Sequence, residues 1–371
     1  MRSSLLALAA AVSVFGCNPP AQSQQPPAPG PAALDQASAA IGQSRQTAIT
    51  RAVETASPAV VSVNVTEVRN VRVRDPFAGF FGRVPERVYQ QQVKGLGSGF
   101  VISPDGYIVT NDHVAGNATK ITVAFPDGST REARLIGSDP ETDIALIKVD
   151  GDALAHLEFE QDGPVAGEWA IALGNPFGLF EAAEPSVTVG VVSAVGRDFP
   201  AQQGRTFRDM IQTDAAINSG NSGGPLLDAL GRVIGMNTFI YSQSGGSVGL
   251  GFAVPAQRIQ QVVAELRDSG TVDRSFYTGL NVRPVDARIA RALDLDDARG
   301  LIVSSVDPDS PAERAGLEPY DVIVTIEDDP VVTNEDVRQR LVDKRAGDRV
   351  ALGVVRDGRG VTVTLTLAAG S

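Results

Sequence analysis

Short runs of apolar residues, broken by turn sequences, dominate the chain from about residue 59 onward. Residues 60–65, 107–110 and 144–149 carry Val, Ile, Leu or Ala in alternation or in unbroken series, and turns such as residues 104–106, Pro-Asp-Gly, separate them. Short runs of β-branched residues bounded by Gly, Pro and Asp are typical of β-strands. Many short strands with tight turns favour an all-β barrel or sandwich.

Two segments depart from this strand pattern before a second unit begins. Residues 67–94 form a long polar stretch, which predicts a functional or disordered loop. Residues 255–268 place apolar side chains at helical spacing, between an initial proline and a following glycine, which predicts an amphipathic helix. From about residue 273 the pattern predicts strands, short helices near 312–316 and 334–344, and two final strands.

The first residues are typical of a targeting segment. Arg2 precedes an apolar run over residues 5–15, which is too short to span a bilayer and fits a signal peptide. Cys17 ends this run in a sequence similar to a bacterial lipobox, which predicts lipidation; an ordinary signal peptide is the alternative. The residues that follow are rich in Pro and Gln and predict a tether. We therefore expect a signal peptide at 1–17, a tether at 18–47, a first domain at 48–270 and a second at 271–371.

Composition narrows the candidate functions. The formal net charge is −12 and is spread along the chain, so no basic cluster for nucleic-acid binding is indicated. A single cysteine excludes an intramolecular disulfide, so core packing must hold the fold. The chain has only two histidines, His113 and His156, which limits histidine-dependent chemistry to two candidates.

A serine in a glycine-rich run is the candidate nucleophile. Residues 220–224 read Gly-Asn-Ser-Gly-Gly, and a serine hydroxyl needs both a base and N–H donors for the developing oxyanion. The glycines permit the tight backbone turns that such an arrangement requires. We expect the oxyanion hole at Gly220, Asn221 and Ser222, with the N–H groups of Gly220 and Ser222 as the donors. Taken alone, a glycine-rich hairpin turn explains the run equally well.

Two further positions complete a constellation. His113 follows the predicted strand that ends at Thr110, and Asp143 opens another apolar strand. Each has a structural explanation by itself. The order His, Asp, Ser matches the chymotrypsin-like arrangement of a catalytic triad. We predict Ser222 as nucleophile, His113 as general base and Asp143 as the residue that orients it, whereas His156 lacks this context.

With these motifs the chain resembles serine proteases of the Deg/HtrA family, in a DegS-like layout with one PDZ domain. The resemblance covers about residues 48–369 and also rests on residues 172–178, Ala-Leu-Gly-Asn-Pro-Phe-Gly, and on residues 212–218 and 249–255. It implies a mainly β fold, a chymotrypsin-like double β-barrel followed by one α+β PDZ domain. It also implies a homotrimer and an ATP-independent endopeptidase without cofactor or metal.

The resemblance further implies binding and regulatory residues. An apolar S1 pocket that favours Val or Ala would be formed by Ile217, Tyr241 and Leu250, with Tyr241 standing where an aliphatic residue is more usual. The charged segment 197–209 would carry regulation through Arg197 or Arg205. A C-terminal peptide would bind the PDZ domain by strand addition. The residues expected around that peptide are Tyr277, Thr278, Gly279, Leu280, Val337 and Leu341, with Thr278 unusual for its position.

Two functional hypotheses follow from the sequence. The first is a periplasmic protease of the bacterial cell envelope, anchored to the membrane by a lipid on Cys17, that cleaves misfolded or regulatory proteins. Its partners would be unfolded or membrane-protein substrates and C-terminal peptides, with no nucleic acid. The alternative is a chaperone or peptide-binding scaffold in which proteolysis is secondary. A binding module needs no triad, so the three motifs together favour the protease.

Overall fold

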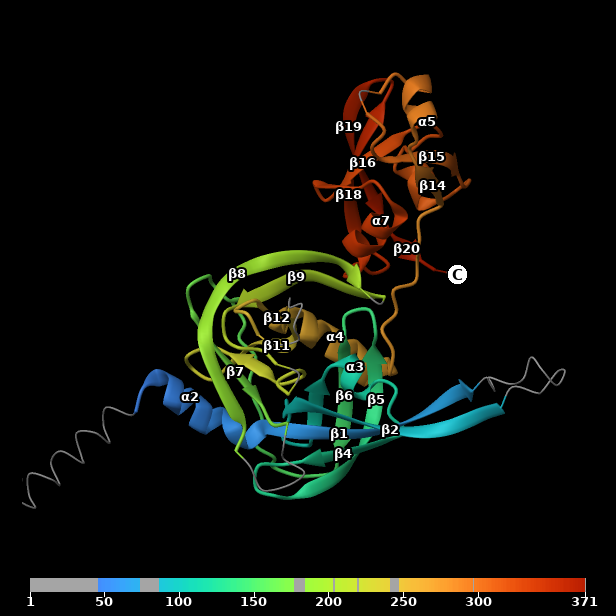
Figure 1. The fold of residues 1–371 in the computed structure, drawn as a ribbon. Helices are drawn as coiled ribbons and strands as arrows, with labels where there is room; N and C mark the ends of the chain where they lie inside the picture. Colours follow the sequence, from blue (N-terminus) through green and yellow to red (C-terminus); the bar gives the residue numbers. More distant parts are fainter. Residues whose placement is uncertain are drawn as a thin grey trace, which may run out of the picture. The chain divides into compact units, whose positions relative to one another are not determined.

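A computed structural model describes residues 46–73, 87–176, 184–202, 204–218, 220–240, 247–295 and 297–370. Two closed barrels form the first part of the described chain (Figure 1). The predicted double β-barrel is therefore confirmed. The first barrel has the strand order β1-β2-β3-β6-β5-β4, formed by β1 (Val60–Val73), β2 (Arg87–Val101), β3 (Tyr107–Thr110), β4 (Lys120–Ala124), β5 (Thr130–Asp139) and β6 (Ile144–Val149). The second has the order β10-β11-β12-β9-β8-β7, formed by β7 (Trp169–Gly174), β8 (Ser186–Gln202), β9 (Arg205–Thr213), β10 (Pro225–Leu227), β11 (Val233–Ile240) and β12 (Gly251–Pro255).

The apolar runs of the sequence become the inner faces of these barrels. Phe100, Ile108 and Leu146 are fully buried in the first barrel, and Ile211 lies with several alanines in the second. Helix α4 (Ala256–Ser269) follows β12, contacts β5, β6 and β11, and buries an apolar stripe in the same core. It begins after Pro255 and ends at Gly270, as the sequence predicted.

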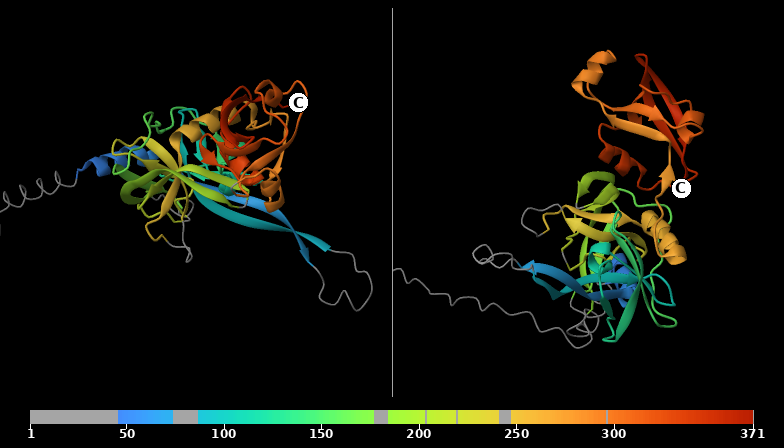
Figure 2. Two further views of the ribbon diagram at one scale, coloured as in Figure 1. Left: turned by 90° about the horizontal axis from the view of Figure 1, so that it is seen from above. Right: turned by 90° about the vertical axis from the view of Figure 1, so that its right-hand side faces the viewer.

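Two strand pairs are longer than the sequence suggested. The pairing of β1 with β2 continues from Val60↔Phe100 to Val73↔Arg87, so residues 67–73 and 87–94 of the predicted loop form a two-stranded ribbon (Figure 2), and residues 74–86 lie outside the described residues. The pairing of β8 with β9 reaches Gln202↔Arg205. The predicted loop at residues 197–209 is therefore a β-hairpin. Polar residues are frequent in both segments, so the alternation of apolar and polar residues by which a strand is recognised is weak there.

The described chain begins just before helix α2 (Ala48–Ala56), whose first turn is capped by the Thr47 side chain, and a short 3₁₀ turn, η1 (Ser57–Ala59), leads into β1. Cys17, the predicted signal peptide and most of the predicted tether lie outside the described residues. None of the helices in the described part combines the length and apolarity that crossing a bilayer requires.

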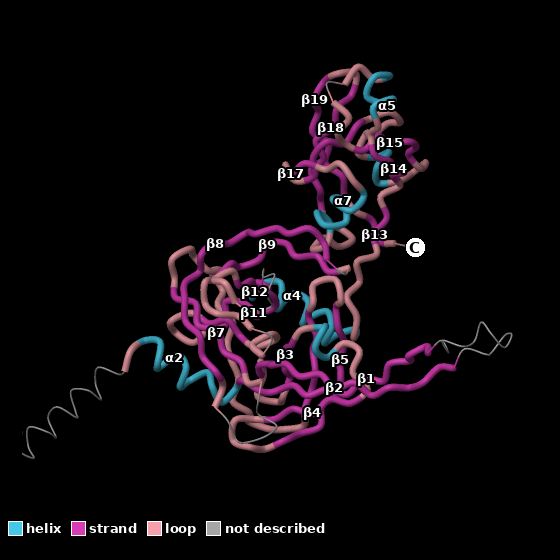
Figure 3. Tube along the Cα trace, viewed as in Figure 1, coloured by secondary structure: helices cyan, strands magenta, loops and turns pink. Residues whose placement is uncertain are grey.

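The C-terminal unit is a mixed α+β fold around one antiparallel sheet (Figure 3). Its sheet has the order β14-β15-β16-β18-β19, with β17 paired to β16 and a separate β13–β20 pair. Leu301, Val303, Leu352 and Leu365 form its core with residues from the other strands. The elements are β13 (Phe276–Tyr277), β14 (Leu280–Pro284), α5 (Ala287–Ala292), β15 (Leu301–Val306), α6 (Pro311–Arg314), β16 (Val322–Ile326), β17 (Asp329–Pro330), α7 (Asn334–Leu341), β18 (Arg349–Arg356), β19 (Arg359–Thr366) and β20 (Ala368–Ala369).

Candidate active site

Backbone geometry ties the candidate acid, Asp143, to the turn that carries the candidate base. His113 lies in α3 (Asp112–Ala115), a single helical turn that follows β3. Asp143 precedes β6 with φ of 60°, a left-handed conformation that aspartate tolerates better than most residues. Its carbonyl accepts hydrogen bonds from the N–H of Asp112 at 3.2 Å and from Asn111 Nδ2 at 3.0 Å. Its carboxylate also accepts the backbone N–H of His113 at 3.0 Å.

The side chains of His113 and Asp143 form the pair that the sequence predicted. His113 Nδ1 lies 2.8 Å from Asp143 Oδ2, with 1% of the acid and 38% of the imidazole side chain exposed. A carboxylate at Nδ1 favours the tautomer with the proton on that nitrogen. The other ring nitrogen, Nε2, is then free to accept a proton.

The turn that carries Ser222 requires glycine next to the serine. Gly223 has φ of +84°, and a Cβ there would lie 2.3 Å from the Ser98 carbonyl oxygen and 2.6 Å from Thr110 Oγ1. Its N–H donates to the Asn237 carbonyl at 2.8 Å. The turn is therefore packed tightly between β2 of the first barrel and β11 of the second.

Ser98 is buried behind this turn and forms hydrogen bonds with several segments around it. Its N–H donates to the Ser222 carbonyl at 2.9 Å, and its hydroxyl donates to the Gly220 carbonyl at 2.7 Å. The same hydroxyl accepts the N–H of Asn175 at 2.8 Å, and the Ser98 carbonyl accepts Thr110 Oγ1 at 2.7 Å. Ser98 therefore fixes the peptide planes on both sides of the nucleophile. The sequence analysis missed it, because a serine inside a strand carries no local signal of such a role.

The Ser222 hydroxyl lies in the same cavity as His113 but is hydrogen-bonded elsewhere. Both residues line a cavity of about 340 Å³, together with Leu96 and neighbouring residues of β1 and β2. Ser222 Oγ donates to the Thr238 carbonyl at 3.2 Å, and within the described residues no hydrogen bond joins it to His113. The structure pairs His113 with Asp143 and places His113 and Ser222 at one cavity, while the hydroxyl of Ser222, the candidate nucleophile, is bonded to Thr238.

One of the three backbone N–H groups of the predicted oxyanion hole is already hydrogen-bonded within the turn. The N–H of Asn221 donates to the Asn218 carbonyl at 2.9 Å, so this donor is engaged. The N–H groups of Gly220 and Ser222 donate to no acceptor among the described residues. These two groups remain the candidate donors for an oxyanion.

The predicted S1 residues are only partly described. Ile217 is fully buried in the core of the second barrel, where a Cβ on Gly251 would lie 2.6 Å from its Cγ1. Leu250, which precedes Gly251, is 36% exposed. Tyr241 lies outside the described residues. The composition of the S1 pocket therefore stays a prediction.

An arginine from the β8–β9 hairpin contacts the candidate acid directly. Arg205 Nε donates to Asp143 Oδ1 at 3.1 Å, and Arg205 Nη2 donates to Asp112 Oδ2 at 3.2 Å. Burial raises the pKa of the Asp112 carboxyl, and this guanidinium opposes that rise. The other predicted regulatory residue, Arg197, is exposed and forms no ion pair within the described part of the chain.

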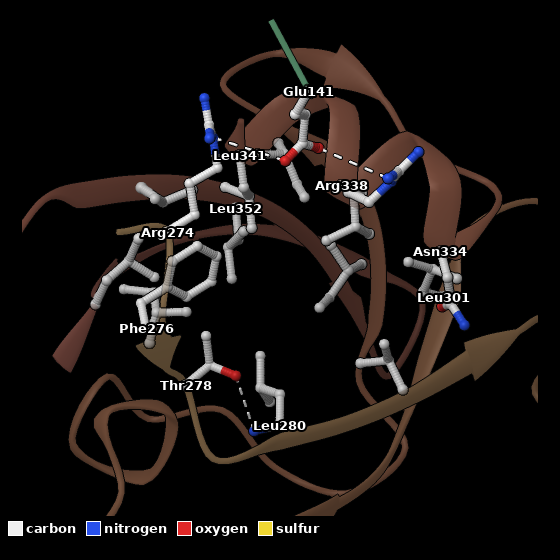
Figure 4. A pocket seen from close by; sticks show the side chains of 17 residues that line it. Glu141, Arg274, Phe276, Thr278, Leu280, Leu301, Asn334, Arg338, Leu341 and Leu352 are labelled. Atoms are coloured by element: carbon white, nitrogen blue, oxygen red, sulfur yellow. Dashed lines mark hydrogen bonds and ion pairs between the residues drawn. The ribbon is translucent and has the colours of Figure 1, made fainter. Parts of the chain in front are cut away.

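A second cavity of about 470 Å³ lies between α7 and the sheet of the C-terminal unit (Figure 4). Of the six residues predicted for peptide binding, Thr278, Leu280, Val337 and Leu341 line it. Tyr277 instead donates its hydroxyl to Asp307 at 2.8 Å. The cavity is mainly apolar, and its lining also includes Phe276, Arg274, Arg338 and Glu141, none of which the sequence analysis had named.

The carboxylate loop of this groove has two distinctive features. Gly279 has φ of +74°, and a Cβ there would lie 2.1 Å from the Ser310 Cβ, so this position requires glycine. The Leu280 N–H donates to the Thr278 hydroxyl at 3.2 Å (Figure 4). One of the N–H groups at the predicted carboxylate site is therefore already engaged by the loop's own side chain.

Comparison with known proteins agrees with both parts of the fold. The trypsin-like peptidase domain family matches residues 97–236, and the PDZ domain family matches residues 277–367. A probable periplasmic serine endoprotease, DegP-like, of Pseudomonas fluorescens is 38% identical over 340 residues, which cover 86% of this chain and 70% of that protein. The chain belongs to the Deg/HtrA family of serine proteases.

Other members of the Deg/HtrA family show how far the likeness extends. A DegP-like protein of Chlamydia trachomatis is 43% identical over 295 residues, which cover 78% of this chain and 58% of that protein. The chain thus spans a little over half the length of several of its curated relatives. Among solved structures, an HtrA-type protease AlgW with a decapeptide matches with a TM-score of 0.62 and 36% identity, covering 87% of this chain and 99% of that one.

Proposed function

We propose that this protein is a serine endopeptidase of the bacterial cell envelope that cleaves misfolded or regulatory proteins. The observation that carries the proposal is the 2.8 Å contact between His113 Nδ1 and Asp143 Oδ2, together with the cavity that His113 and Ser222 both line. The N–H groups of Gly220 and Ser222 in the glycine-rich turn, which have no acceptor among the described residues, add hydrogen-bond donors for an oxyanion.

The proposed mechanism begins with a rotation of the Ser222 side chain from the Thr238 carbonyl toward His113 Nε2. Ser222 Oγ then attacks the scissile carbonyl carbon while its proton passes to Nε2, and Asp143 stabilises the resulting imidazolium. The oxyanion of the tetrahedral intermediate accepts the N–H groups of Gly220 and Ser222. His113 next protonates the leaving amine, and water hydrolyses the acyl-enzyme by the same steps in reverse order.

The proposed setting is the periplasm, since the relatives are named periplasmic proteins. We also propose that a lipid on Cys17 anchors the chain, that residues 18–47 form the tether and that the protein assembles as a homotrimer. Its substrates would be unfolded or membrane proteins, with small aliphatic residues such as Val or Ala before the cleaved bond.

Peptide binding in the groove beside α7 is proposed to regulate cleavage. Glu141, two residues before Asp143, lies 3.7 Å from Arg338 of α7 and 3.7 Å from Arg274, measured between charged groups (Figure 4). The Glu141 carbonyl accepts the N–H of Thr206 at 2.7 Å, and Thr206 follows Arg205. A peptide that displaced Arg338 or Arg274 would therefore act on the segment that carries the catalytic acid.

The carboxylate loop offers a prediction specific to this chain. Replacing Thr278 with valine removes the hydroxyl that holds the Leu280 N–H, so that N–H becomes available to a terminal carboxylate. We expect T278V to bind an apolar C-terminal peptide about 3- to 10-fold more tightly, the effect of about one hydrogen bond. Calorimetry with a peptide ending in a free carboxylate measures this change.

The matched control is Thr278→Ser, which keeps the hydroxyl and should leave the dissociation constant near the wild-type value. A C-terminally amidated peptide should lose the gain in T278V, because it lacks the charged acceptor. Weaker binding in T278V would contradict the proposed competition at the Leu280 N–H.

The experiment that tests the proposed function is a cleavage-site profile. The purified chain is incubated with denatured casein, with and without a library of C-terminal peptides, and products are identified by mass spectrometry. We expect internal cuts after Val or Ala, at a rate that peptides increase. Suppression of aggregation without any cuts would favour the chaperone alternative and contradict the peptidase assignment.

A further inference from the structure

The carboxylate of Asp143 is bound from two sides. One side is His113, through its backbone N–H at 3.0 Å and its ring Nδ1 at 2.8 Å. The other side is Arg205, whose Nε lies 3.1 Å from Asp143 Oδ1. The same guanidinium reaches Asp112 Oδ2 at 3.2 Å, so one cation lies between two carboxylates.

All three members of this cluster are shielded from water. Their exposed side-chain fractions are 1% for Asp143, 6% for Asp112 and 19% for Arg205. Charges in such surroundings interact more strongly than on an open surface, because water screens them less. Two buried carboxylates this close to one cation are expected to depend on it to remain ionised together.

The hairpin holds Arg205 in place by its backbone. The next residue, Thr206, donates its N–H to the Glu141 carbonyl at 2.7 Å, which fixes β9 beside the segment leading to Asp143. Arg205 itself pairs with Gln202 across the hairpin. A guanidinium delivered in this way has a defined direction toward Asp143.

We propose that Arg205 is a positioning residue of the catalytic triad: its guanidinium holds Asp143 and Asp112 in place and makes protonation of His113 harder. The proposal rests on the proposed peptidase activity for its functional meaning. A positive charge beside Asp143 disfavours a second positive charge on His113. Removal of Arg205 also leaves Asp112 and Asp143 to repel each other, which would add to the pKa rise that burial already gives Asp112.

Several other charged groups lie near His113 and Asp143. Asp112 and His113 are on α3, and Arg205 is on β9. Asp139 and Glu141 precede Asp143 in the sequence. Both form ion pairs with Arg274, so their negative charges are partly neutralised. Glu67 of β1 and Lys94 of β2, of opposite charge, line the cavity beside His113. Arg205 is the cation in direct contact with Asp143 among the described residues.

Nuclear magnetic resonance of labelled histidine tests the proposal without relying on turnover. The chain has two histidines, so His156, which is exposed, serves as an internal reference. In Arg205→Gln we expect the titration midpoint of His113 to rise by about one pH unit, while that of His156 does not move. In Arg205→Lys, which keeps the charge, most of the rise should be absent.

Two further variants separate an electrostatic role from a structural one. Asp112→Asn removes a neighbouring negative charge and should move the His113 midpoint in the opposite direction, to lower pH. Arg197→Gln, on the same hairpin but exposed, should leave it unmoved. An unchanged His113 midpoint in both Arg205→Gln and Asp112→Asn would overturn the proposal.

Kinetics then give an independent readout. If the acid limb of kcat/KM moves up by about one pH unit in Arg205→Gln, activity falls about tenfold at pH values below that limb and changes little above it. A uniform loss at all pH values would contradict the proposal. A wild-type chain without peptidase activity would refute the proposed function, and the His113 titration would still decide the role of Arg205.

Discussion

Replacing Ser222 with alanine is expected to lower kcat for protein cleavage by about 10⁶-fold, because a serine nucleophile and its base act as a unit. The change removes one hydroxyl and its hydrogen bond to the Thr238 carbonyl, which stabilises the fold by only about 1 kcal/mol. Thermal unfolding should therefore shift by a few degrees at most. Cleavage of denatured casein, followed by the release of soluble peptides, measures the loss.

The control for S222A is peptide binding in the C-terminal groove, whose lining does not include Ser222. Binding of a C-terminal peptide should stay at the wild-type dissociation constant, and circular dichroism should be unchanged. Cleavage by S222A at more than a small fraction of the wild-type rate would show that another residue is the nucleophile.

Asp143→Asn is expected to cost about 10⁴-fold in kcat. Asparagine has the same shape but no charge, and its amide nitrogen can donate toward His113 Nδ1. Either change favours the His113 tautomer that carries its proton on Nε2. In that tautomer Nε2 cannot accept the proton of the Ser222 hydroxyl. The substituted residue also loses its ion pair with Arg205. Active-site kinetics with a peptide substrate, at saturating and limiting concentrations, separate this loss of kcat from any change in KM.

An exposed aspartate of the same barrel provides the matched control. Asp127→Asn changes a turn residue between β4 and β5 whose carboxylate accepts the Ser129 N–H and makes no contact with the three candidate catalytic residues among the described residues. Its activity should remain within about twofold of wild type. A similar loss in both variants would mean that charge or stability, rather than the position of Asp143, accounts for the effect.

The fold was predictable from sequence, and a candidate triad could be named, because each depends on local patterns. Short apolar runs between Pro-Asp-Gly and similar turns indicated the barrels, and three separate motifs in the order His, Asp, Ser indicated the triad. The structure places His113, Asp143 and Ser222 in one region, as that order implied. A helix between Pro255 and Gly270 was likewise predictable, because both of its ends carry residue-specific signals.

The contacts that join distant segments were not predictable in the same way. The β8–β9 hairpin has register shifts at several places along its length, which break the alternation by which strands are recognised. The sequence therefore suggested a charged loop, and Arg205 was named without its partners Asp143 and Asp112. The Ser98 network depends on segments more than 70 residues apart and has no local signature.

The orientation of the nucleophile was also beyond sequence reasoning. Whether Ser222 Oγ bonds to Thr238 or to His113 depends on one side-chain torsion, which the order of residues does not determine. In this structure Ser222 Oγ donates to the Thr238 carbonyl at 3.2 Å. Substrate or peptide binding is the proposed source of the free energy that reverses this preference.

The most direct test of the central claim is covalent labelling by a fluorophosphonate, which reacts with an activated serine hydroxyl. Peptide mapping by mass spectrometry should locate one adduct on Ser222 in the wild-type chain, and His113→Ala should lose nearly all of that labelling. An adduct on another serine, or equal labelling of Ser222 in the wild type and in His113→Ala, would contradict the assignment of Ser222 as a nucleophile activated by His113.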